Sequence, residues 1–429
     1  MEAETKAPLV ADDEGDSGGD KNLDVALNRL ERFIALLGFL DSPSRARLAA
    51  SCAAFLLLGV AVPSAAICLS RCSQSRGDEY EVQQFELCVL VSEASLAAVS
   101  LAAVSRNLLK YGVRRFLFVD QHHGQVDRLQ QEYVCKIQEF FRLLLWWILP
   151  CFIVKTAREI VRFIYIFHES RWRSIVVFLA STMSWVYLTI ILLSACMLFN
   201  LVCNLQVIHF EDYGKLLERD VDALICLEEH VRLRYYLSKI SHRFRIFLLL
   251  LFLFVTASQF VTLFQTTGYN GKINFANAGD IAVSSVVQVI AVVLCLNAAS
   301  KISHRAQGVA SLASRRHAYV ACCPADPQMQ STNSSWNLEA IPASSSLMDY
   351  SESDSESLEN MALHNNAQLS SFVSSYHKRQ ALVMYLQSNP GGITIFGWTV
   401  DRALLNTLFS FELTLVLFVL GETIVFPSG

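Results

Sequence analysis

The run SIVVFLASTMSWVYLTIILLSACMLFNLVCNLQVI, residues 174–208, decides the fold class of this chain. It contains no Asp, Glu, Lys or Arg over 35 residues. A bilayer core about 30 Å thick needs roughly 20 apolar residues of helix, so this run is more than long enough to cross a membrane. We expect the helix to continue beyond the hydrocarbon core into the cytosol.

Six further apolar windows of similar character occur along the chain. Only 17% of the 429 residues are charged, whereas a soluble domain has about 25%. The first 20 residues are acidic and polar, so the first apolar run is predicted to be an uncleaved span. The sequence therefore predicts an all-α polytopic membrane protein with seven transmembrane helices, the other six windows being 48–69, 85–105, 143–167, 246–267, 280–300 and 403–426.

The distribution of basic residues predicts the orientation. Of the 35 Lys and Arg residues, 27 fall in the N-terminal segment and in the three loops that share its side, and 5 fall in the loops opposite. Basic residues accumulate on the cytosolic side of membrane proteins. We therefore expect a cytosolic N-terminus and an extracellular C-terminus.

The chain divides into segments of different composition. An apolar stripe at Leu23, Leu27, Leu30, Ile34 and Leu37 predicts a helix, either lying on the inner membrane surface or packed under the bundle. The predicted segments are a disordered acidic N-terminus at 1–21, an amphipathic cytosolic helix at 22–47, a six-helix transmembrane bundle at 48–300 with cytosolic helical extensions at 106–142 and 209–245, a cytosolic loop at 301–401 that is disordered at about 322–370, and the last transmembrane helix at 402–429.

Motifs of soluble catalysis are missing from the sequence. It has no nucleophile elbow, P-loop, dinucleotide-binding glycines, zinc motif or kinase signature, so we expect no enzyme, no metal, no cofactor and no nucleic-acid partner. Polar groups inside a membrane are costly and usually functional, so they are the candidate site.

Polar side chains recur in the outer halves of the second, third, fifth and sixth spans. In the third span they fall three and four residues apart, on one helix face, and Glu93 in the second span needs a cationic partner, Lys155 or Arg158. They fit either a chamber for a small ligand or a set of structural ion pairs. The predicted chamber residues are Glu86, Glu93, Lys155, Arg158, Glu159, Arg162, Gln259, Thr262, Gln265, Ser284 and Gln288.

The last span carries a narrow stripe of small and polar residues with an acidic residue, Glu422, near its outer end. Several copies of such a helix around a symmetry axis could enclose a pore, and small-residue helix packing uses the same residue types. The predicted pore-lining residues are Thr407, Ser410, Thr414, Leu417, Gly421 and Glu422.

The stretch Gly397-Trp-Thr-Val-Asp-Arg-Ala-Leu-Leu405 resembles the approach to the last helix of insect gustatory receptors. Thr414 stands at the position of a family Thr, and Leu415 replaces the Tyr that follows it. After five apolar residues, Gly421-Glu422 replace a Gln-Phe pair. The whole chain is most similar to the plant gustatory receptor-like family. The resemblance implies seven helices with the N-terminus inside and, as in the insect relatives, tetramers, a central pore from the last helix and an outward-facing ligand pocket.

We interpret the chain as a chemoreceptor-like membrane protein, a homotetrameric ligand-gated cation channel. Its partners would be membrane lipid, further copies of itself, permeant cations and an unidentified small molecule, at the plasma membrane or an internal membrane. Two alternatives stay open. One is a non-conducting scaffold that recruits cytosolic partners, and the other is a small-molecule transporter, although no paired repeat is evident.

Overall fold

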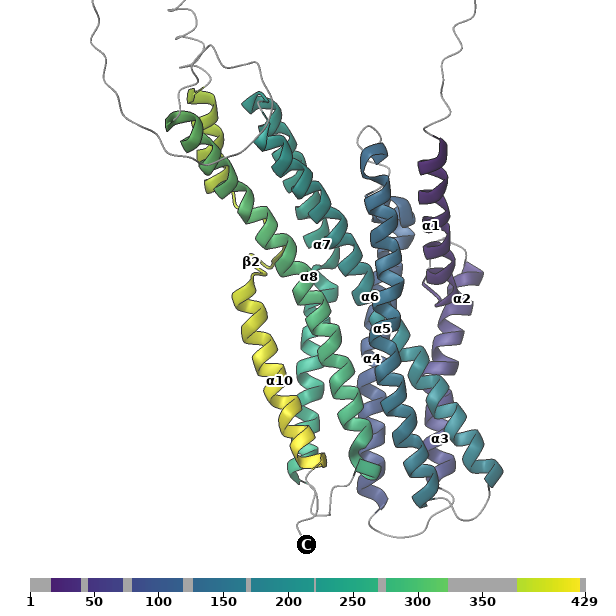
Figure 1. The fold of residues 1–429 in the computed structure, drawn as a ribbon. Helices are drawn as coiled ribbons and strands as arrows, with labels where there is room; N and C mark the ends of the chain where they lie inside the picture. Colours follow the sequence, from purple (N-terminus) through teal and green to yellow (C-terminus); the bar gives the residue numbers. More distant parts are fainter. Residues whose placement is uncertain are drawn as a thin grey trace, which may run out of the picture. The chain divides into compact units, whose positions relative to one another are not determined.

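The computed structural model describes residues 17–39, 45–71, 79–118, 126–166, 171–219, 221–268, 275–322 and 376–424. Almost all of its regular structure is helical (Figure 1). The elements are α1 (Ser17–Leu36), α2 (Arg45–Ala54), the π-helix η1 (Phe55–Ala61), α3 (Val62–Arg71), α4 (Glu79–Phe116), α5 (Val126–Ile166), α6 (Arg171–Glu218), α7 (Ala223–Gly268), α8 (Phe275–Cys322), β1 (Thr394–Ile395), β2 (Trp398–Thr399) and α10 (Arg402–Ile424).

Among the described residues, six stretches are long and apolar enough to cross a membrane. They cover six of the seven predicted windows. The seventh window coincides with α10, which has 23 residues and whose role as a span stays a prediction. The six stretches are Arg45–Leu69, Glu86–Phe116, Gln130–Val161, Ile175–Glu218, Ala223–Thr267 and Gly279–Cys322.

Helices α6, α7 and α8 are far longer than a bilayer is thick. They contain 48, 46 and 48 residues. Each is therefore about 70 Å long, more than twice the hydrocarbon core. The predicted continuation of the 174–208 run as helix is confirmed.

The chain forms two compact units, and both receive residues from these three long helices. The first unit comprises Met1–His209, Tyr235–His304 and Gly392–Gly429, and the second comprises Phe210–Arg234 and Arg305–Gly391. The predicted bundle at 48–300 thus differs from the first unit, which also includes α1 and α10 and excludes the chain around the α6–α7 connection.

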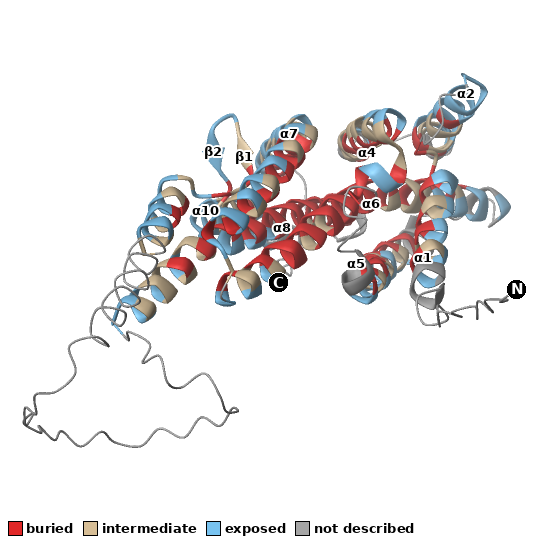
Figure 2. Ribbon diagram, turned by 90° about the horizontal axis from the view of Figure 1, so that it is seen from above, coloured by how far each residue is buried: buried red, intermediate tan, exposed pale blue. Residues whose placement is uncertain are grey.

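The core of the first unit is built on α6 and α8 (Figure 2). Their apolar windows are the most deeply buried of the six candidate spans. A helix that is apolar on every side is stable when other helices or lipid surround it, and most of the uncharged 174–208 run is enclosed by other helices.

Helix α1 packs against α5. Its apolar stripe from Leu23 to Leu37 is buried, and Phe33 meets Phe140 and Phe141 with ring centroids 6.1 and 5.4 Å apart. The packed position is therefore the one that the structure supports.

The helix also begins within the segment predicted to be disordered, at Ser17. The rest of the predicted N-terminal disorder, residues 1–16, and the predicted disorder at about 322–370 lie outside the described residues, apart from Cys322 at the end of α8.

A two-stranded hairpin leads into α10, and its four strand residues leave the described structure nearly all-helical, as predicted. Phe396 and Gly397 between β1 and β2 have φ of 50° and 90°. Positive φ at both central residues defines the tight turn that suits the twist of paired strands, and glycine adopts it without strain. Asp401 then caps α10, because its Oδ1 accepts a hydrogen bond from the Leu404 amide at 2.9 Å.

Candidate functional site

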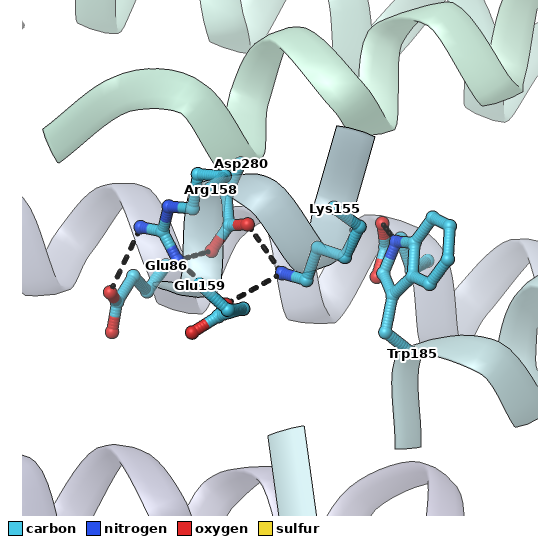
Figure 3. Close-up of polar contacts among 7 residues, drawn as sticks. Glu86, Lys155, Arg158, Glu159, Trp185 and Asp280 are labelled. Carbon is cyan, nitrogen blue, oxygen red and sulfur yellow. Dashed lines mark hydrogen bonds and ion pairs between the residues drawn. The ribbon is translucent and has the colours of Figure 1, made fainter. Parts of the chain in front are cut away.

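Five charged side chains from α4, α5 and α8 form an ionic cluster: Glu86, Lys155, Arg158, Glu159 and Asp280 (Figure 3). Arg158 lies at its centre with an exposed fraction of 0%. Its Nη1 is 2.8 Å from both Glu159 Oε1 and Asp280 Oδ2, and its Nη2 is 3.6 Å from Glu86 Oε1. The Lys155 ammonium lies 3.2 Å from Glu159 Oε1 and also pairs with Asp280.

The charges of the ionic cluster are paired with one another, and this pairing determines whether the cluster can bind a ligand. Charges buried in a medium of low dielectric are tolerated only when opposite charges and hydrogen bonds compensate for lost hydration. Here two cations are shared among three carboxylates from three helices. The geometry favours the structural ion-pair interpretation for these five residues, since the cations are already engaged within the chain.

The prediction that Lys155 or Arg158 is the partner of Glu93 holds only at longer range, because Lys155 attracts the Glu93 carboxylate electrostatically but no ion pair within 4 Å joins Glu93 to either cation. Glu93 Oε1 accepts a hydrogen bond from Trp185 Nε1 of α6 at 3.1 Å, while Lys155 and Arg158 are paired elsewhere. Asp280, at the start of the α8 span, forms direct ion pairs with both Lys155 and Arg158. Trp185 was missed because a tryptophan in an uncharged run is usually a packing residue.

A small cavity adjoins the ionic cluster. Its volume is about 60 Å³, and Glu86, Glu93, Lys155, Trp185 and Asp280 contribute to its wall. A buried water needs roughly 10–15 Å³ on this measure, so the space suits a few waters. It is too small for an organic ligand of ordinary size.

A large cavity of about 380 Å³ lies between α4, α7 and α8. Cavities that hold small molecules start at roughly 300 Å³. Apolar and hydroxyl-bearing side chains both contribute to its wall. The described lining residues are Leu87, Cys88, Val89, Val91, Ser92, Ser95, Phe254, Ala257, Ser258, Val261, Thr262, Gln265, Ile281, Ser284 and Ser285.

Two buried glutamines lie behind the wall of the large cavity. Gln259 Nε2 donates to Gln288 Oε1 at 3.3 Å, and Gln288 Nε2 reaches the hydroxyls of Ser92 and Ser284, each at 3.2 Å. Both serines line the cavity, so the glutamines hold two of its hydroxyl groups in place without lining it themselves.

The predicted single chamber is therefore divided in the structure. Charged members belong to the ionic cluster or the small cavity, and neutral members belong to the large cavity or its supporting wall. The side chain of Arg162 lies outside the described residues. The groups are Glu86, Glu93, Lys155, Arg158 and Glu159 for the charged part, Thr262, Gln265 and Ser284 for the large cavity, and Gln259 and Gln288 for its wall.

On α10, the predicted pore stripe points away from the rest of the chain. Thr407, Ser410, Thr414, Leu417 and Gly421 are all exposed. The opposite face is buried, with Glu412 at 1% and Val416 at 4% exposed. At 100° per residue the centres of the two faces lie about 160–180° apart. The side chain of Glu422 lies outside the described residues.

Three hydrogen bonds tie α10 and the segment before it to the helices of the large cavity. Thr256 Oγ1 of α7 donates to Glu412 Oε1 at 2.9 Å. At the hairpin, the amides of Ile393 and Thr394 donate to Ser303 Oγ of α8 and Ser241 Oγ of α7 at 3.1 and 3.3 Å. The segment that enters α10 is thus anchored to both helices.

These features define a helical membrane protein of the insect olfactory receptor type of fold. The structure of the olfactory receptor OR5 from the insect Machilis hrabei in complex with eugenol matches with a TM-score of 0.58 and 12% identity, covering 93% of this chain and 98% of that one. A second structure of the same receptor matches with a TM-score of 0.51, again at 12% identity, over 92% and 98% of the chains.

The chain belongs to the family DUF3537, described as a protein of unknown function, whose model matches residues 25–411. A comparison with curated proteins gives no significant match. The predicted resemblance to insect chemoreceptors is confirmed at the level of the fold, while plant origin and kinship with gustatory receptors in particular stay predictions.

Proposed function

We propose that the protein is a chemoreceptor-like channel of the plasma membrane. Four copies place α10 around a shared axis and conduct cations when a small molecule binds among the other helices. The observation that carries this proposal is the exposed stripe of Thr407, Ser410, Thr414, Leu417 and Gly421, which lies opposite the buried face of α10.

The chemistry of the stripe suits a water-filled pore. Thr407 and Thr414 hydroxyls donate to the carbonyls of Ala403 and Ser410 at 3.0 and 2.7 Å, which leaves their oxygens available to a passing cation. Small side chains permit close approach of four helices, and hydroxyl groups line pores without trapping ions. The sequence places Glu422 one residue beyond the stripe, where a ring of four carboxylates would concentrate cations.

The orientation and span count belong to the same proposal. With α10 as a seventh span and most basic residues on the side of the N-terminus, the C-terminus faces outward. The cavity-lining ends of α4, α7 and α8 then lie in the outer half of the membrane.

A coupling route follows from α7. This helix supplies Ser258 and Thr262 to the large cavity and Thr256, two residues before Ser258, to the contact with Glu412. A ligand that shifts α7 by a fraction of a helical turn would therefore move a residue bonded to α10. Such a shift has an effect only if the ligand binds the open and closed arrangements with different affinity.

Cysteine cross-linking tests the shared axis without knowledge of the ligand. Thr414→Cys on the stripe is expected to form disulfide-linked dimers on mild oxidation in native membranes, because four copies would face one another. Phe411→Cys is the control, since Phe411 is also exposed but lies off the stripe. The native cysteines are retained in both variants, and the unsubstituted chain gives the background. Equal cross-linking of the two variants would argue against the pore.

A scaffold function is the second candidate, and the second compact unit favours it. Its α7 segment exposes Leu224, Ile225 and Val231, at 66%, 54% and 49%. Apolar side chains gathered on one segment can mark a protein interaction site. Deleting residues 322–370 separates the two functions: a channel should still conduct, whereas a scaffold should lose its partners.

A further inference from the structure

We propose that the large cavity binds a neutral, mostly apolar small molecule that carries one hydrogen-bonding group and enters from the bilayer. This inference rests on the proposed function in one respect, that the cavity is the ligand site of the receptor. It specifies what the proposed function leaves open, namely the chemical class of the ligand and its route of entry.

The absence of charge from the wall sets the ligand class. Of the described side chains that line the large cavity, none is charged, whereas Glu86, Glu93 and Lys155 of the predicted chamber line the small cavity. A charged ligand would lose its hydration without gaining an opposite charge, which is strongly unfavourable. A sugar, with many hydroxyls to satisfy, would meet the same difficulty against the leucine, valine and phenylalanine side chains of this wall.

Two of the hydroxyl groups on the wall are positioned in advance. The hydroxyls of Ser92 and Ser284 are both held by Gln288, and Ser284 is only 3% exposed. Fixed polar groups in an apolar pocket orient a ligand and give it specificity. A ligand hydroxyl or carbonyl would therefore lie near these serines at the inner end of the cavity.

The rim of the cavity is apolar and open. Leu87, Val91 and Val261 all line it, yet they are 52%, 60% and 46% exposed. They belong to two candidate membrane spans, α4 and α7, so their exposed surfaces would meet hydrocarbon once these helices cross the bilayer. A molecule dissolved in the bilayer can reach the cavity through this rim, with its apolar part trailing toward the lipid.

Photolabelling of the purified full-length protein tests the inference directly. The probe is 3-azioctanol, an eight-carbon alcohol with a diazirine, and the adducts are mapped by peptide mass spectrometry. We expect saturable labelling on the cavity-lining stretches of α4, α7 and α8. Excess unlabelled octanol should compete, whereas glucose and choline should not.

Two variants of α7 provide a matched pair. Ser258→Phe fills the cavity from a half-buried lining position and should reduce saturable labelling at least tenfold. Leu253→Trp adds bulk at a residue that is 59% exposed and is not among the described lining residues, and it should leave labelling unchanged. Thermal melting of each variant reports folding, and the adduct map of the unsubstituted protein needs no variant at all.

Labelling that does not saturate, that spreads evenly over lipid-facing residues, or that survives Ser258→Phe would overturn the inference. Equal competition by glucose or choline would do the same. Because no current is measured, the result is independent of conduction. Specific labelling of a protein that never conducts would retain the site and remove the channel, whereas conduction without specific labelling would retain the channel and remove this ligand class.

Discussion

The ionic cluster and the α10 stripe are both polar in a chain built for a membrane, yet their surroundings are opposite. Arg158 in the cluster is completely buried and lies within 4 Å of three carboxylates of the same chain. Thr407, Ser410 and Thr414 of the stripe are exposed and uncharged. The charges of the first set are paired within the chain, and the second set offers its polar face to something outside the chain.

This difference distinguishes polar residues that stabilise the fold from polar residues that act in assembly or conduction. Buried charges that satisfy one another fix how α4, α5 and α8 pack, and removing one partner leaves the others uncompensated. Exposed hydroxyls contribute little to the stability of a single chain, because water or their own backbone can bond them. Substitutions in the cluster should therefore act on folding, and substitutions in the stripe should act on assembly and conduction.

The largest expected effect follows from breaking the cluster. Arg158→Met leaves Glu86, Glu159 and Asp280 with less compensation and should lower the free energy of unfolding by about 3–5 kcal/mol. Unfolding by SDS titration in mixed micelles measures the change. Adding Asp280→Asn to Arg158→Met should recover part of the loss.

Arg305→Met is the control for that experiment, because Arg305 and Glu211 form a largely exposed pair at 3.1 Å. Its cost should be at most about 1 kcal/mol. Similar losses for the buried and the exposed arginine would refute the structural role of the cluster.

The next effect is expected in the stripe. Thr414→Trp should reduce single-channel conductance in planar bilayers at least tenfold, because four indoles would fill the axis, while the melting temperature stays unchanged. Phe411→Trp, at an exposed position off the stripe, should leave conductance near that of the unsubstituted protein. If Phe411→Trp blocked the channel and Thr414→Trp left it open, the pore would be lined by the Phe411 face of α10 and not by the stripe.

The hairpin before α10 gives a smaller effect that involves the backbone alone. Gly397 has a φ of +90°, and no atom lies within 4 Å of the position where a Cβ would stand. Gly397→Ala should therefore cost about 1–2 kcal/mol through left-handed strain without any clash. Gly308→Ala, in the interior of α8 and equally free of contacts, should be neutral or stabilising. Equal stability of the two variants would show that the turn is not required.

The smallest effect concerns the predicted acidic ring. Glu422→Gln should lower cation conductance about twofold at low salt, because the carboxylates raise the local concentration of cations. The difference should shrink at high salt, where the Debye length falls to about 3 Å. Unchanged conductance at every salt concentration would remove Glu422 from the pore.

Much of the helical architecture was predictable, because length and hydropathy constrain it strongly. The uncharged 174–208 run became the most buried part of α6, and the spacing of Leu23, Leu27 and Leu30 correctly identified the buried face of α1. The stripe on α10 was also predictable, since one helix face depends only on residue spacing.

The partners of the charged residues were not predictable in the same way. Spacing placed Lys155 and Arg158 on one face of α5, but it does not say how α5 is rotated against its neighbours. Asp280 therefore makes the direct ion pairs with both cations, Lys155 acts on Glu93 only at longer range, and Trp185 donates the hydrogen bond to Glu93. The division of one expected chamber into a small charged cavity and a large neutral one has the same cause, because the described wall of the small cavity comes from five helices and that of the large cavity from three.

The subunit count of the purified protein tests the central claim most directly. Native mass spectrometry in a mild detergent would give it, with lipid retained to protect weak interfaces. We predict a tetramer, because one α10 cannot enclose a pore and its polar stripe is exposed in the single chain. A stable monomer that still binds the octanol probe would contradict the shared axis and leave a ligand-binding membrane protein without a central pore.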